Sequence, residues 1–574
     1  MDLLRLIAPE LILIAFACAL FLLGISSKAA ARRAAPVLAL VALAAAFVVE
    51  LLRDPSFATA ADSFHAFRIT PFTHYVRLLA TSISVIFVLM SWPSDRGATG
   101  NSALNFGTEA GEFFALMLLS VSGVLLVAGA DDMILLFLGI ELASIPTYIM
   151  VSISRPLAVA QEAGVKYFFL GAMSAAVMLF GFSYLYGTTG TTSLRAIAEM
   201  FAASLDGAGT SRMTPWQLLA VLMLMAGFGF KIAAVPLHVY VGDVYQGAAT
   251  PLTAMLSFVP KTSGFVALIK LLYVAGGGSF AVPETVARLL WVLAALTMTV
   301  GNVLGLIQIV NVKRVLAYSS VAHTGYMLVG LTALVYASPN DPTGGRLPDD
   351  ALTGVLFYLA AYGLMNAGAF GVLMMLPARR DAYGFSRGTG QAPVATSAET
   401  YEDIAGQGRN HPALGLAMAV SCFSLIGLPL TVGFLGKFFL LAPAMRAGMT
   451  WLVVIALINA AISAAYYLKI VGTMFLRPEP APSGPARDVS DAGATAAPLR
   501  SLPVAIAVAV SSIGTLVLGS VLPAAQALKI TVNLAAQVDE PIQQHGAAAT
   551  AAARTPAPNA RDDAETARPR AGVP

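Results

Sequence analysis

The stretch that decides the fold reads FGFKIAAVPLH, from Phe228 to His238, and it has a counterpart in IGLPLTVGFLGK, from Ile426 to Lys437. Each stretch places proline, glycine and one lysine within a few residues of each other inside a long apolar run. Proline removes a backbone donor and clashes with the preceding turn of a helix. In lipid, freed backbone groups are tolerated only inside protein or beside water. The two stretches therefore predict interrupted membrane helices that line a transport path.

The composition indicates a membrane protein. The 574 residues are 57% hydrophobic and only 11% charged, whereas a soluble domain carries about 25% charged residues. A helix that crosses the bilayer needs about 20 apolar residues. Fourteen such runs span residues 6–24, 34–52, 72–92, 112–130, 132–153, 162–187, 215–237, 250–274, 285–310, 315–336, 353–376, 412–442, 450–476 and 501–522. The runs do not alternate as barrel strands would, so we predict an all-α polytopic membrane protein with about fourteen transmembrane helices.

The two interrupted runs are the seventh and the twelfth, and they stand five helices apart. This spacing predicts two five-helix repeats, 112–274 and 285–476, and an odd number of spans makes the repeats inverted. Residues 1–111 are expected to hold helices 1 to 3, and residues 501–522 form the fourteenth helix. The tail, 523–574, is rich in Ala, Pro and Gln, so we expect it to be periplasmic and largely disordered.

Lysine and arginine are concentrated in the loops that follow odd-numbered helices, such as Lys313 and Arg314 after the ninth. Loops rich in these residues face the cytoplasm. We therefore expect a multi-pass protein of the bacterial inner membrane with both termini in the periplasm. The first apolar run contains Glu10 and lacks a strongly basic start, so it is interpreted as a retained helix rather than a signal peptide.

Four ionisable residues lie deep within predicted helices: Glu141 in the fifth, Lys231 in the seventh, Lys261 in the eighth and Lys437 in the twelfth. A charge at the bilayer centre costs about 2.5–3.5 kcal/mol on insertion scales, so such residues are functional by default. A Glu–Lys pair that opens and closes can load and unload a proton. The alternative for Glu141 and Lys231 is a static salt bridge between helices. Lys261 and Lys437 have no obvious carboxylate partner in the neighbouring runs.

Histidine and cysteine give weaker signals. His238 and His323 lie in or beside the predicted helices, and each is either a hydrogen-bonding relay or a packed polar group. Cys18 and Cys422 stand far apart, without a CxxC motif or a Cys/His cluster, so no iron–sulfur, zinc or disulfide framework is expected. The net charge of +3 is too small to suggest a nucleic acid partner.

Three longer segments resemble the antiporter-like (Mrp-type) membrane subunits of bacterial NADH–quinone oxidoreductase, respiratory complex I. They run from Pro236 to Ala254, from Asn311 to Tyr326 and over 427–438. With the helix-5 segment around Glu141, the resemblance covers about 112 to 476. It departs from the family pattern after His238, where Val241 and Gly242 replace a tryptophan and a proline that the family often shows.

The resemblance implies roles for the buried charges. Glu141 matches the helix-5 glutamate that pairs with the helix-7 lysine, here Lys231. Lys261 matches the central lysine of helix 8, and Lys437 matches the helix-12 lysine at the exit side. A lysine at 437 disfavours the M branch of the family, and the helix-5 segment together with Asp243-Val-Tyr favours the N branch over the L branch.

The resemblance also implies a function. We expect a proton-translocating, non-redox subunit that binds no cofactor, with NADH, FMN, iron–sulfur clusters and quinone (ubiquinone in many respiratory chains) handled by partner subunits. Its expected partners are subunits M, K and J, the lipid bilayer and protons. Two alternatives remain: a subunit of a multi-subunit Na⁺/H⁺ antiporter, and a structural membrane subunit with an inactive channel. Co-purification distinguishes the oxidoreductase subunit from the antiporter subunit: the former is expected to co-purify with NADH dehydrogenase subunits, and the latter with small antiporter subunits.

Overall fold

The computed structural model describes residues 3–26, 29–53, 63–64, 66–92, 110–155, 157–204, 212–336, 346–376, 397–479 and 501–520. The tail that the sequence predicts to be disordered, 523–574, lies outside these residues. Regular structure in the described residues is helical apart from one short antiparallel pair, β1 (Ser63–Phe64) and β2 (Phe67–Arg68).

The helices follow the predicted apolar runs. They are α1 (Leu3–Leu6), α2 (Ala8–Gly24), α3 (Ala29–Leu51), α4 (Pro71–Met90), α5 (Ala110–Gly129), α6 (Met133–Ile153), α7 (Ala158–Thr189), α8 (Leu194–Ala203), α9 (Pro215–Lys231), α10 (Val241–Gly247), α11 (Thr250–Ala275), α12 (Glu284–Ile307), α13 (Val312–Tyr336), α14 (Arg346–Met375), α15 (Tyr401–Ile404), α16 (Gln407–Asn410), α17 (Pro412–Ile426), α18 (Val432–Arg446), α19 (Thr450–Phe475) and α20 (Leu502–Ser520). Each predicted run coincides with a helix or an interrupted helix, which confirms the all-α membrane fold. Among the described residues, 10 helices are long and apolar enough to cross a membrane, and the count of fourteen stays a prediction.

Both predicted interruptions are present. Helix α9 ends at Lys231 and α10 begins only at Val241, while α17 ends at Ile426 and α18 begins at Val432. Each interruption contains one non-glycine residue with a positive φ, Ala233 at 61° and Leu430 at 69°. A left-handed conformation costs an L-residue about 1–2 kcal/mol, so the surrounding packing must hold both segments in place.

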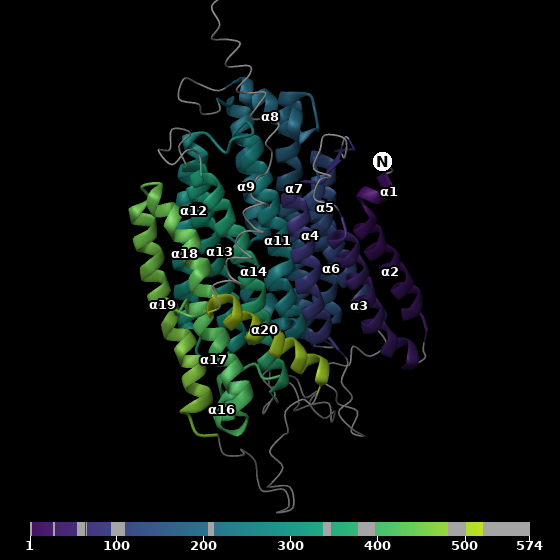
Figure 1. Ribbon diagram of the computed structural model, residues 1–574, viewed down its shortest axis with the longest axis vertical. Coiled ribbons are helices and arrows are strands. Elements are labelled where there is room, and N and C mark those ends of the chain that lie inside the picture. Colours follow the sequence, from purple (N-terminus) through teal and green to yellow (C-terminus); the bar gives the residue numbers. More distant parts are fainter. Residues whose placement is uncertain are drawn as a thin grey trace, which may run out of the picture. The chain divides into compact units, whose positions relative to one another are not determined.

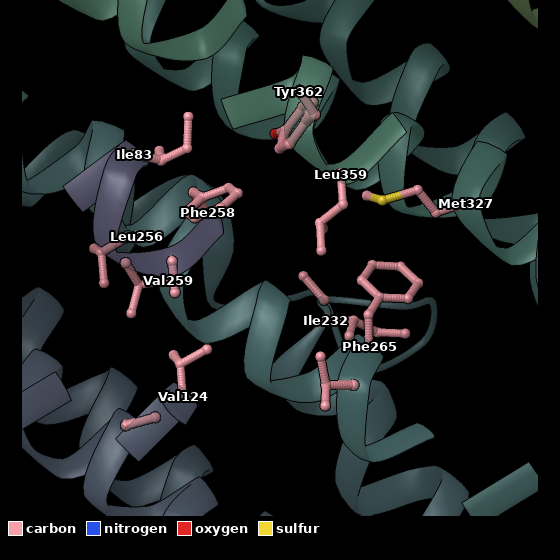
Figure 2. Packing of buried hydrophobic residues seen from close by; sticks show 14 of the residues in the cluster. Ile83, Val124, Ile232, Leu256, Phe258, Val259, Phe265, Met327, Leu359 and Tyr362 are labelled. Carbon is pink, nitrogen blue, oxygen red and sulfur yellow. The ribbon is translucent and has the colours of Figure 1, made fainter. Parts of the chain in front are cut away.

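The most buried helices are α11 and α14. The apolar window of α11 is 100% buried and that of α14 is 94% buried, whereas the windows of α12 and α19 are each 39% buried. In Figure 1, α11 and α14 lie between α2 and α3 on one side and α19 on the other. Figure 2 shows how Phe258 and Phe265 of α11 pack among apolar side chains that include Leu359 and Tyr362 of α14. A lysine on α11 is therefore enclosed by protein rather than by lipid.

Close helix packing positions α13. A Cβ on Gly301 of α12 would lie 2.5 Å from the backbone nitrogen of Ala322, and a Cβ on Gly325 of α13 would lie 2.4 Å from that of Met298. Neither distance is one that a real Cβ tolerates, so only glycine allows the two backbones to approach this closely. This contact fixes the rotation of α13 about its axis, and with it the position of His323 one residue after Ala322.

Candidate functional site

The first predicted pair forms between α6 and α9. The Lys231 Nζ donates to Glu141 Oε1 at 3.0 Å and to the Tyr148 hydroxyl at 3.1 Å. Lys231 is 3% exposed, and the Glu141 side chain is 13% exposed. Tyr148 stands seven residues after Glu141 and so lies on the same face of α6, two turns further on. The sequence predicted the ion pair but not the tyrosine.

Lys231 is the last residue of α9, where the helix leaves backbone carbonyls without intrahelical partners. The negative end of the helix dipole favours a cation there. One of these carbonyls, that of Phe230, accepts a hydrogen bond from the Tyr240 hydroxyl at 2.9 Å. The interruption thus places an amine, a carboxylate and phenol groups together inside the protein.

A small cavity connects the first pair with the central lysine. Its volume is about 10 Å³, and its lining includes Lys231, Lys261, Tyr240 and Tyr245. A space of this size holds roughly one water molecule, and polar groups on several sides provide the partners that such a water needs. The geometry therefore allows a hydrogen-bonded connection between the two amines.

Lys261 lies in the middle of α11 and bonds only to neutral groups among the described residues. Its Nζ donates to the Ser320 carbonyl at 2.6 Å, to Ser320 Oγ at 2.5 Å and to Thr324 Oγ1 at 3.0 Å. The Thr324 hydroxyl in turn donates to the carbonyl of Ile232, in the first interruption, at 2.7 Å. Lys261 is 2% exposed.

His323, on α13, is the next buried polar residue after Lys261 in a row that begins at Glu141 and Lys231. Its Nδ1 lies 2.5 Å from the Tyr358 hydroxyl and its Nε2 lies 3.0 Å from the Tyr467 hydroxyl. The Tyr362 ring stands between this imidazole and the central lysine: its centroid is 5.2 Å from the imidazole, and Lys261 Nζ is 5.9 Å from it. Both ring nitrogens are thus hydrogen-bonded, which is the arrangement that a relay histidine needs.

Lys437 lies beside the second interruption. Its Nζ donates to the carbonyls of Leu425 at 3.0 Å and Ile426 at 2.8 Å, which are freed at the end of α17. The same amine lies 4.6 Å from the centroid of the Tyr326 ring, and that centroid is 5.9 Å from the His323 imidazole. Among the described residues, Lys437 is thus held by two carbonyls and one aromatic ring, and it is 7% exposed. The row therefore extends from Glu141 to Lys437.

His238 is not brought into this row. It lies in the first interruption, and its neighbour Val239 is 65% exposed. Among the described residues, its Nδ1 is buried and makes no hydrogen bond. Its role as a relay stays a prediction, without a contact to the lysines to support it.

One buried charge cluster was missed by the sequence reasoning. The guanidinium of Arg77 on α4 contacts Glu10 of α2 at 2.5 Å and Glu50 of α3 at 3.0 Å. All three side chains are at most 1% exposed. This cluster joins the first three long helices. The available signal was that Arg77 stands inside the third apolar run, where an unpaired cation would be costly.

Comparison with known proteins gives the family. A model described as "NADH:quinone oxidoreductase/Mrp antiporter, TM" matches residues 130–463. The chain belongs to this family. The matched region contains Glu141, Lys231, Lys261 and Lys437, and it includes both interruptions.

Named relatives agree with the family. NADH-quinone oxidoreductase subunit N of Trichlorobacter lovleyi is 39% identical over 409 residues, which cover 71% of this chain and 74% of the relative. F(420)H(2) dehydrogenase subunit N of Methanosarcina mazei is 33% identical over 523 residues, covering 89% and 95%. A chain of Thermus thermophilus respiratory complex I with bound aureothin superposes with a TM-score of 0.66 at 30% identity, covering 91% and 98%. A chain of the Mrp complex from Dietzia has a TM-score of 0.71 at 19% identity, which shows the shared fold alone.

Proposed function

We propose that this chain is subunit N of a bacterial NADH–quinone oxidoreductase and that it carries protons across the inner membrane. The observation that supports this is the row of buried polar groups from Glu141 and Lys231 through Lys261 and His323 to Lys437. Each predicted repeat, 112–274 and 285–476, contributes one interrupted helix to the row. Both termini face the periplasm in this arrangement.

The energies involved agree with an ion pair between Glu141 and Lys231 that separates and forms again during turnover. Removing one partner of a buried ion pair costs about 3–5 kcal/mol. Moving one charge through 100 mV costs about 2.3 kcal/mol. Separating Glu141 from Lys231 therefore changes the energy of the buried ammonium by enough to expel a proton against a membrane potential. The proton passes through the cavity between Lys231 and Lys261, and then along the Ser320 and His323 hydrogen bonds.

The redox chemistry takes place in partner subunits in this proposal. NADH, FMN, iron–sulfur clusters and quinone are bound there, and this chain contacts subunits such as M, K and J. The Methanosarcina relative is named for a different electron donor, F(420)H(2). Related membrane subunits that work with different electron donors do not themselves need to bind those donors.

The Na⁺/H⁺ antiporter alternative has weaker support. Its solved representative, the Dietzia Mrp chain, is 19% identical to this chain, whereas the relatives at 33% and 39% identity are named as dehydrogenase or oxidoreductase subunits. The oxidoreductase assignment is therefore preferred.

The decisive experiment changes the central lysine. Lys261→Ala removes an amine that lines the small cavity and also contacts α13. We expect fewer protons pumped per NADH oxidised in membrane vesicles, at equal content of assembled complex. Lys166→Ala is the control, because this lysine is on α7 with its side chain 44% exposed. If Lys261→Ala pumps as well as the parent complex, the proposal is wrong.

A further inference from the structure

A second buried charge cluster lies apart from the row. The Glu399 carboxylate accepts hydrogen bonds from Arg155, just after α6, and from Lys313, in the first turn of α13, the latter at 3.3 Å. The three residues are 1%, 8% and 0% exposed. Arg155 and Lys313 belong to loops that the sequence predicts to be cytoplasmic, yet both are enclosed by protein.

The cluster lies directly behind a surface groove. This groove has a volume of about 400 Å³ and is lined by residues that include Gln246, Asn311, Arg314 and Thr400. Arg314 and Thr400 are the sequence neighbours of Lys313 and Glu399, and Asn311 stands two residues before Lys313. Gln246 accepts a hydrogen bond from Lys313 through its carbonyl at 3.4 Å. The groove lining is therefore in direct contact with the cluster through Gln246.

The charges around the cluster are mixed. Asp403 accepts hydrogen bonds from the backbone nitrogens of Glu399 and Thr400 at 3.0 and 2.8 Å. At the groove, Arg314 pairs with Asp243 of α10 at 3.0 Å. Acidic and basic groups both lie around the cluster and the groove, so the charge there is not of a single sign.

On the inner side, the cluster points along α13 to the central lysine. Lys313, Ala317, Ser320 and Thr324 follow one another at helical spacing and so share one face of α13. Ser320 and Thr324 are the groups that contact Lys261. At about 1.5 Å per residue, Lys313 and Ser320 are separated by roughly 10 Å along the helix. Leu316 and Ala317 lie between them on this side of the helix, and the side chain of Ala317 is one of the smallest.

A second connection runs through α10. Tyr245 is the neighbour of Gln246, which lines the groove, and its hydroxyl lies 3.2 Å from Ser320 Oγ. Lys313 also donates to the carbonyl of Ala248, in the link between α10 and α11, at 2.6 Å. Tyr245 thus joins the groove lining to Ser320, and Lys313 contacts the link between α10 and α11.

We propose that Glu399 and Lys313 form a loading station through which protons pass from the groove to Lys261; this rests on the proposed function. A hydronium ion in the groove protonates a carboxylate oxygen of Glu399 and leaves as water. The ammonium of Lys313, whose charge is then uncompensated, releases one proton toward Ser320, and the amine of Lys261 accepts it. Glu399 next returns its proton to the Lys313 amine. The ion pair is restored, and one proton has moved inward.

The test variant is Glu399→Gln, which keeps the shape of the side chain but cannot exchange a proton. We expect proton pumping per NADH to fall several-fold when the groove side is alkaline and to recover partly when that side is acidified. The control is Glu402→Gln, because the Glu402 side chain is exposed on the same segment. The pH profile matters because a purely structural ion cluster would give the same deficit at every pH.

Glu399→Gln leaves two buried cations, so it can impair assembly. The double variant Arg155→Gln with Glu399→Gln removes one charge of each sign and so leaves the net charge of the three-residue cluster unchanged. If the assembled double variant pumps like the parent, or is impaired equally at all pH values, the loading station is wrong. If Glu399→Gln pumps normally while Lys261→Ala pumps poorly, only the proposal of a loading station is wrong. If Lys261→Ala also pumps normally, the proposed function is wrong as well.

The groove itself is tested by labelling. Gln308→Cys places a thiol in the groove lining, in a background where the exposed Cys18 is replaced by alanine. A membrane-impermeant thiol reagent is expected to label it from the cytoplasmic side of oriented vesicles. Labelling only from the periplasmic side would place the groove on the wrong face for loading and would overturn the proposal.

Discussion

The two interrupted helices differ in the groups that surround the lysine beside each interruption. In the first, residues 232–240 are not helical, and the adjacent Lys231 forms an ion pair with Glu141. In the second, the shorter segment 427–431 is not helical, and the adjacent Lys437 contacts carbonyls and the Tyr326 ring. The first lysine thus has a carboxylate that can move away, whereas the second is held by groups that are fixed parts of a helix end.

The space around the two interruptions also differs. A Cβ on Gly229 would meet only the Leu237 side chain at 3.5 Å and the Ala234 side chain at 3.9 Å, which are ordinary contacts. A Cβ on Gly433 would lie 1.8 Å from the backbone carbonyl oxygen of Ser424. The helix end before the first interruption therefore has space for a methyl group at Gly229, whereas the helix start after the second has none at Gly433. We interpret the first as the part that changes during turnover and the second as a rigid exit.

The largest effect expected from this comparison is steric. Gly433→Ala forces its methyl group into the Ser424 carbonyl and so must displace α18 from α17. We expect the amount of assembled subunit to fall severely, as measured by quantifying the subunit in purified complexes. Gly229→Ala is the matched variant and should assemble normally. Equal assembly of the two would remove the distinction between a rigid and a mobile interruption.

The second prediction distinguishes two roles of the Glu141–Lys231 ion pair, proton transfer and static attachment of one helix to another. Glu141→Gln or Lys231→Met alone leaves an unpaired buried group, which costs about 3–5 kcal/mol, so both pumping and assembly suffer. The double variant carries no charge, and replacing a buried pair by neutral groups is often neutral for stability. We expect the double variant to assemble while its pumping stays at least about tenfold below the parent, as measured in vesicles.

A static salt bridge gives the opposite result for that double variant, because two neutral side chains would hold α6 and α9 together equally well. Restored pumping along with restored assembly would therefore show that the pair only joins the helices. The comparison between the interruptions would then lose its mechanistic meaning, although the difference in space around Gly229 and Gly433 would remain.

The fold was largely predictable because lipid imposes strong rules on sequence. Long apolar runs must be helices, and proline beside glycine marks the places where they break. The pairing of Glu141 with Lys231 was also predictable, since two opposite charges buried on nearby helices need each other. The identity of the family followed from the segments around those same charges.

The neutral partners were not predictable, because hydroxyl groups are common in membrane helices and only packing selects among them. Nothing in the sequence singles out Ser320 and Thr324 as the groups that hold Lys261. Arg77 and Lys313 were misleading for another reason. Lys313 stands in the first turn of α13, where a cation is normally solvated, and the carboxylate partners of both residues come from distant parts of the chain.

The smallest expected effect concerns two tyrosines that hold the two lysines in different ways. Tyr148 uses its hydroxyl, which accepts a hydrogen bond from Lys231 at 3.1 Å, whereas Tyr326 offers the face of its ring to Lys437 at 4.6 Å. Tyr148→Phe removes one hydrogen bond to a charged group, worth about 1.5–3 kcal/mol at most because Glu141 remains. Tyr326→Phe keeps the ring and with it the cation–π contact.

We therefore expect Tyr148→Phe to lower pumping by a few-fold and Tyr326→Phe to leave it nearly unchanged, at equal content of assembled complex. Assembly should not separate them, because each variant keeps the aromatic packing of its site. A Tyr326→Phe defect as large as that of Tyr148→Phe would mean that the Tyr326 hydroxyl, which donates to the Ala456 carbonyl at 3.4 Å, takes part in the path. The second interruption would then depend on a hydrogen-bonded phenol as the first does, and its lysine would not be held by fixed groups alone.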